Sequence, residues 1–130
     1  MIEFGIKKIV QYKKTLGVLL GIAVLCLLPV PDLKTIPKIP WLGILGIDKW
    51  AHFVLYFFLY RIWSLENTNP LKNTWKVVLL SISFGASIEF LQDLYVRNRA
   101  AEWADFFADF SGLLFGYFVF QHRRYWSDNS

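Results

Sequence analysis

The chain has 130 residues, enough for one domain, and 55% of them are hydrophobic, against about 45–50% in soluble proteins. Aromatic residues reach 18%, and the mean hydropathy is positive at +0.39. The formal net charge of +4 does not indicate nucleic-acid binding, because the basic residues flank apolar runs and do not share one face. Composition therefore favours an integral membrane protein over a soluble one.

The first apolar run follows four lysines and predicts a membrane helix at about residues 15–30. It does not match a cleaved signal peptide, because two prolines end the run and no small-x-small cleavage site follows. Gly17 and Gly21 have a GxxxG spacing, which can let a neighbouring helix approach. The single cysteine, Cys26, is expected to be a small buried hydrophobe.

The next segment, residues 31–46, contains three prolines and two glycines and predicts a loop with an interfacial part near residues 41–45. A second helix is expected at about residues 48–66. Asp48 suits the start of this helix, where free backbone N–H groups need acceptors. The Asn-Thr-Asn-Pro sequence at residues 67–70 predicts a turn.

Two more apolar segments predict helices at about residues 74–95 and 101–121, the last one ended by the His-Arg-Arg sequence at residues 122–124. The predicted fold class is therefore all-α: a polytopic membrane protein with a bundle of four transmembrane helices. Residues 1–130 are expected to form a single domain.

Lysine and arginine placement predicts the orientation, because cytoplasmic segments carry an excess of these residues. With the N-terminus inside, nine of the 14 basic residues fall on the inner side: Lys7, Lys8, Lys13, Lys14, Arg61, Lys72, Lys76, Arg123 and Arg124. The outer five are Lys34, Lys38, Lys49, Arg97 and Arg99. Both termini are thus expected in the cytoplasm of a multi-pass protein of the inner or plasma membrane, with Trp63 in the inner aromatic belt.

Each of the last three predicted helices carries one stripe of polar and small residues at helical spacing. The stripes are Asp48, His52 and Tyr56, then Ser81, Gly85, Glu89 and Gln92, then Asp105, Asp109, Gly112 and Gly116. An up-down bundle brings the charged parts of these stripes to the same face. Carboxylates at membrane depth are costly, so they should face the bundle interior or a wet cavity.

In these residues the sequence resembles the VanZ-like family. The matching residues are Asp48-Lys49-x-x-His52-Phe53-x-x-Tyr56, Glu89-x-x-Gln92, Arg99, Asp105, Gly112 and Gly116. They span about residues 47–117. The family pattern usually has an asparagine where this chain has Asp109. The resemblance implies a small polytopic membrane protein of the cell envelope, linked to resistance to the glycopeptide antibiotic teicoplanin, with no settled biochemical mechanism.

Three functions are open at this point: a binding protein for a lipid-linked envelope component, an enzyme acting on such a lipid, and a structural module whose buried charges specify folding. The predicted ligand-binding residues are Asp48, Lys49, His52, Tyr56, Glu89, Gln92, Arg99, Asp105 and Asp109. Among them, the candidates for acid–base catalysis are His52, Glu89 and Asp105. Whether the chain is an enzyme, and its oligomeric state, stay open.

Arg99 is expected to join Glu89, Asp105 and His52 in one outer-leaflet site for an anionic headgroup, because the arginine fork binds carboxylate or phosphate. The expected partner is a membrane lipid or a lipid-linked envelope precursor, with no nucleic acid. No cofactor is expected. A divalent metal bound by Asp48, His52, Glu89 and Asp105 is the lesser alternative.

Overall fold

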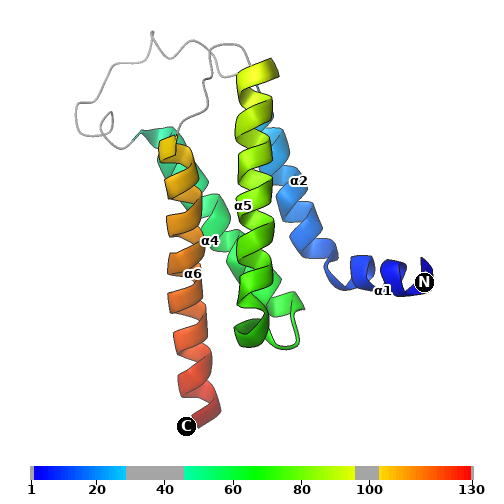
Figure 1. Ribbon diagram of the computed structural model, residues 1–130. Helices are drawn as coiled ribbons and strands as arrows, with labels where there is room; N and C mark the ends of the chain where they lie inside the picture. The colour runs from blue at the N-terminus through cyan, green and yellow to red at the C-terminus, as the bar shows by residue number, and fades with distance from the viewer. Residues whose placement is uncertain (1, 29–45, 96–102, 130) are drawn as a thin grey trace.

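A computed structural model describes residues 2–28, 46–95 and 103–129. The regular structure of these residues is entirely helical, which confirms the predicted all-α fold class. The helices are α1 (Ile2–Gln11), α2 (Lys13–Leu27), α4 (Ile47–Glu66), α5 (Pro70–Tyr95) and α6 (Trp103–Asn129), shown in Figure 1. The predicted interfacial part at residues 41–45 and Arg99 lie outside the described residues.

The long helices α2, α4, α5 and α6 run alternately up and down, and α1 projects sideways from them (Figure 1). The most extensive packing is between α4 and α6, and α2 and α5 pack against this pair. The bundle therefore has two distinct ends. The cluster end holds the last turns of α2 and α5 and the first turns of α4 and α6, and the turn end holds the connection from α4 to α5.

Glycines on α6 allow its close approach to α4. A Cβ atom on Gly112 would collide with the backbone carbonyl of Phe53. A Cβ atom on Gly116 would lie 3.0 Å from Tyr60 Cβ and 3.1 Å from the Phe57 carbonyl oxygen. The predicted backbone packing at the two glycines is thus confirmed. Small residues have this role where membrane helices meet.

The glycines of α2 behave differently. A Cβ atom built on Gly17 or Gly21 would have no described atom within 4 Å, apart from the adjacent residues and the backbone of α2 itself. The expectation that their GxxxG spacing admits a neighbouring helix is therefore not met within the described part of the chain. The buried face of α2 is formed instead by Thr15, Leu19, Ile22 and Cys26.

Prolines set two helix boundaries that differ from the predicted ones. α2 ends at Leu27 because Leu28 precedes a proline and takes an extended conformation (φ −65°, ψ 136°). α5 begins at Pro70, four residues before the predicted start, because proline fits the first helical position, where its missing N–H has no partner to lose. Asn69 assists this start by accepting a 3.4 Å hydrogen bond from the Lys72 backbone N–H.

The ends of the chain also differ from expectation. α6 does not stop near residue 121, because no glycine or proline follows, and its last part includes a 3.0 Å hydrogen bond from Trp126 Nε1 to His122 Nε2. α1 was not predicted, and its Gly5–Gln11 part makes an angle of 71° with α2. α4 takes Gly46 as its N-cap at φ 56°, a conformation that favours glycine, so Asp48 is not the cap residue.

The bundle exposes many large apolar side chains and buries several polar ones. Exposed positions on the long helices carry large apolar side chains, including Leu20, Val54, Phe58, Leu79, Phe90, Phe107, Leu114 and Phe118. The interior combines an apolar core with buried polar residues: Thr15, His52, Ser64, Asn67, Ser81, Gln92, Asp105, Asp109 and Gln121. The predicted belt position of Trp63 is wrong, because this residue is 4% exposed and packs against Tyr60 in the core.

Helix length and hydropathy indicate which of the described helices can span a membrane. α5 is long and apolar enough to cross a membrane, and the parts Gly5–Gln11 and Lys13–Leu27 qualify together as a bent pair. No other helix in the described ranges passes the same test. Of the four helices predicted to span the membrane, α5 alone qualifies as a single straight span among the described residues. For the other three, crossing the membrane stays a prediction.

Candidate polar site at the cluster end

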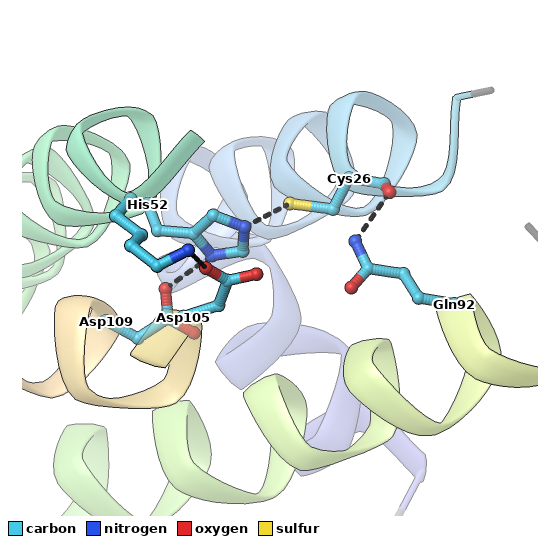
Figure 2. A network of polar contacts seen from close by, with 6 residues as sticks. Cys26, His52, Gln92, Asp105 and Asp109 are labelled. Carbon is cyan, nitrogen blue, oxygen red and sulfur yellow. Dashed lines mark hydrogen bonds and ion pairs between the residues drawn. The ribbon is translucent and has the colours of Figure 1, made fainter. Parts of the chain in front are cut away.

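The deepest part of the site is a histidine–carboxylate pair between α4 and α6. His52 Nδ1 lies 2.8 Å from Asp109 Oδ1, and the two residues are 3% and 5% exposed (Figure 2). Both positions face inward because they lie on the polar stripes of their helices. An imidazole N–H that donates to a buried carboxylate forms a short, charge-assisted hydrogen bond when the carboxylate is ionised.

Cys26 connects this pair to α2 and α5. Its Sγ lies 4.0 Å from His52 Nε2, and its backbone carbonyl accepts a 2.7 Å hydrogen bond from Gln92 Nε2 (Figure 2). The predicted burial of Cys26 is confirmed by its 4% exposure. Its contact with His52 was missed, because only the packing of α2 against α4 brings the two residues together.

A second pair lies one helical turn closer to the cluster end. Lys49 Nζ is 3.5 Å from Asp105 Oδ1, and the exposed fractions of the two side chains are 29% and 4%. Lys49 precedes His52 by three residues, and Asp105 precedes Asp109 by four, so the two pairs stack along the seam between α4 and α6. Lys49 is the more accessible member of this stack and marks its entrance.

Tyr56 and α5 close the inner side of the site. Tyr56 is 1% exposed and hydrogen-bonds to Asp109. A Cβ on Gly85 would lie 3.1 Å from Asp109 Oδ2 and 3.3 Å from Tyr56 Oη, so the absence of a side chain there lets α5 approach. Ser81 Oγ is buried with no hydrogen-bond partner among the described atoms. A cavity of about 10 Å³ beside Ser81, Tyr56 and Asp109 gives room for about one water molecule.

The structure brings together six of the predicted site residues: Lys49, His52, Tyr56, Gln92, Asp105 and Asp109. Glu89 is half-buried one turn before Gln92 on the same helix. The backbone of Asp48 lies in the first turn of α4, and its side chain is outside the described part, as is all of Arg99.

No group of three or more His, Cys, Asp or Glu side chains with the arrangement of a metal site occurs among the described residues. The metal site considered from the sequence requires the Asp48 side chain, which lies outside the described part of the chain.

A further polar contact lies at the turn end, and the sequence did not predict it. Glu66, the last residue of α4, accepts hydrogen bonds from Lys14 N at 2.9 Å, Thr15 N at 2.8 Å and Thr15 Oγ1 at 2.7 Å. Glu66 thus caps the first turn of α2 from another helix.

An apolar exterior around a buried polar cluster, together with an apolar helix of spanning length, defines the class of helical membrane-associated proteins. The family model for VanZ/LLP1 matches residues 26–124, and the chain belongs to this family. The match confirms the resemblance noted from the sequence and includes every described residue of the cluster. The comparisons with curated proteins and with solved structures found no match.

Proposed function

We propose that α2, α4, α5 and α6 each cross the membrane, with both termini in the cytoplasm and the cluster end in the outer leaflet. The apolar exterior of the four helices supports this placement, since lipid-facing positions must be apolar. The 20 residues of α4 measure about 30 Å, which matches a bilayer core. α4 and α6 do not reach the hydropathy expected of a membrane-spanning helix. This result is expected, because these two helices carry the charged pairs of the site.

In this placement, the cluster binds a lipid-linked component of the cell envelope and thereby contributes to glycopeptide (teicoplanin) resistance. The observation that carries the proposal is the stack of the buried pair His52–Asp109 and the pair Lys49–Asp105, in which the carboxylate is buried and the lysine is partly exposed. Buried carboxylates paired in this way are poor contributors to stability, and charge at membrane depth is costly, so a functional role is the better account. Lys49, at the entrance, is placed to meet an anionic phosphate group.

The test compares Lys49→Gln and Asp105→Asn with Ser87→Ala, a control at an exposed position of α5. Native mass spectrometry measures the lipid that copurifies with each variant, and teicoplanin susceptibility is measured in cells with equal membrane levels of protein. We expect the two site variants to lose lipid and protection while the control keeps both. Normal lipid retention and protection in Lys49→Gln and Asp105→Asn would contradict the proposal and favour the structural module.

A second candidate, an enzyme, is favoured by one observation. Cys26 Sγ, the His52 ring and Asp109 follow the order of nucleophile, base and orienting carboxylate, with separations of 4.0 Å and 2.8 Å. The variants Cys26→Ala and His52→Gln separate this candidate from the first. Retained lipid binding with lost protection in both variants would favour the enzyme, and unchanged protection in Cys26→Ala would exclude Cys26 as a nucleophile.

A further inference from the structure

A larger cavity opens at the turn end, far along the bundle from the polar cluster. It measures about 440 Å³, within the range of about 300–1,000 Å³ that is usual for ligand pockets. Residues from the last turns of α4 and from the last part of α6 line it. Figure 1 shows that this part of α6 extends past the turn end. Its polar lining residues are Arg61, Ser64, Asn67, Gln121, Arg123, Arg124 and Ser127.

The charge of this cavity is strongly one-sided. Three arginines line it, and none of the lining residues that the structure describes is acidic. Glu66, the next acidic residue along α4, directs its carboxylate to Lys14 and Thr15 at the start of α2. Arg61 is positioned by Phe120, whose ring centroid lies 4.7 Å from the guanidinium carbon. A held guanidinium beside two exposed arginines is an arrangement that recognises phosphate by paired N–H donors.

Gln121, one of the lining residues, carries a buried amide oxygen. Its Nε2 donates to Tyr60 Oη at 2.7 Å, which fixes the amide orientation. Its Oε1 is buried and accepts no hydrogen bond from the described residues. Buried acceptors are normally satisfied, so a donor such as a ligand hydroxyl or a water molecule is expected here. At the rim, Leu65 is an exposed apolar residue that an acyl chain can cover.

We propose that this cavity binds a phosphate group that carries hydroxyl donors, as in the phosphoglycerol headgroup of an anionic phospholipid. The arginines neutralise the phosphate, and the apolar rim accepts the start of the acyl chains. This site is separate from the cluster end and does not depend on the ligand proposed there, but it rests on the proposed placement of the turn end at the cytoplasmic face of the membrane. Basic pockets at the cytoplasmic ends of membrane helices are suited to such headgroups.

The test uses the full chain in neutral detergent and measures binding of phosphatidylglycerol and phosphatidylcholine by native mass spectrometry. The pocket variant is Arg61→Gln with Arg124→Gln. The control is Lys13→Gln with Lys72→Gln, which removes the same charge from exposed residues that do not line the cavity. We expect about tenfold or greater preference for phosphatidylglycerol in the native chain and the control, and loss of that preference in the pocket variant.

Soluble glycerol 1-phosphate, added as a competitor, distinguishes the two sources of the phosphate. Displacement of phosphatidylglycerol shows that the headgroup chemistry suffices, and no displacement shows that the site takes the whole lipid. If the pocket variant does not fold, Arg124→Gln alone decides, because Arg124 is exposed on the last part of α6. Native preference in the pocket variant or in Arg124→Gln, or an equal loss in the lysine control, would overturn the proposal.

Discussion

Asp109 is the residue on which the deep part of the cluster depends, since it accepts hydrogen bonds from both His52 and Tyr56. The sequence places an acidic residue where the family pattern usually has asparagine. An asparagine Oδ1 can still accept from the imidazole N–H, so the contact does not itself require the negative charge. Asp109 thus adds an ionisable group to a hydrogen bond that a neutral amide would also make.

This difference gives a residue-scale prediction. We expect Asp109→Asn to change the free energy of unfolding by less than about 1 kcal/mol, because the hydrogen bond survives. Asp109→Leu should cost about 3–5 kcal/mol, because it leaves His52 and Tyr56 without a buried partner. Thermal unfolding of both variants in the same detergent is the measurement. Equal losses in the two variants would mean that the charge itself holds the pair together.

Residue patterns in the sequence predicted which side chains are buried, and packing determined which of them meet. The inward position of His52, Ser81, Gln92, Asp105 and Asp109 follows from helical spacing alone. The contact between Cys26 and His52 was not predictable in the same way. It depends on the rotation of α2 about its own axis, and that rotation is set by contacts along the whole helix.

At the scale of elements, the seam between α4 and α6 is the tightest helix contact in the described chain. Its aromatic side chains reinforce the glycine positions: Phe57 packs against Phe115 and Phe120 with ring centroids 5.6 and 5.0 Å apart. Such ring pairs add about 0.5–1.5 kcal/mol beyond their buried area. The position of the polar cluster therefore depends on a seam that tolerates little added volume.

Gly116→Leu should therefore disrupt folding more than Leu114→Ala, a change at a residue that is 44% exposed. Overpacking typically costs about 1–3 kcal/mol, and here the added side chain meets Tyr60 and the α4 backbone, which cannot move freely. The comparison is made by thermal stability in detergent. Matching melting temperatures for the two variants would show that α6 can shift away from α4 at little cost.

The cap that Glu66 places on α2 predicts the effect of removing its charge. The carboxylate accepts hydrogen bonds from Lys14 N, Thr15 N and Thr15 Oγ1. We expect Glu66→Gln to be less stable than the native chain at neutral pH by about 1 kcal/mol, because a neutral amide makes weaker hydrogen bonds to these donors. Melting curves of the two proteins in the same detergent measure the difference, and equal melting temperatures would refute the cap.

Helix boundaries are the part of each element that the sequence predicted least well. The boundaries at Leu28 and Pro70 differ from the predicted ones, although local sequence contains the reason for them, because proline restricts both itself and the residue before it. The cap from Glu66 could not be predicted from local sequence, because its partner helix begins 53 residues earlier, at Lys13. Local sequence therefore accounts for where helices can start, while a cap from a distant helix requires the assembled bundle.

At the scale of the whole molecule, the two ends of the bundle have different chemistry. The cluster end buries carboxylates and a histidine, whereas three arginines line the cavity at the turn end. An alkaline phosphatase fusion after Ser130 is expected to be inactive, and a fusion within residues 96–102 should be active, because phosphatase requires export. Active phosphatase after Ser130 would reverse the proposed orientation. Fluorescent-protein fusions at the same positions provide the opposite readout as a control.

The pairing of α4 with α6 also bears on how the chain is made. His52 and Asp109 are 57 residues apart in sequence, and α5 is synthesised between them. At about 5–20 residues per second, the ribosome needs about 3–11 seconds to pass from one partner to the other. During this interval α4 must remain beside the translocation machinery or in the bilayer without the carboxylates of α6. A nascent chain that stalls before α6 therefore exposes the Lys49 and His52 face of α4, which gives membrane quality-control proteases a feature that the finished protein conceals.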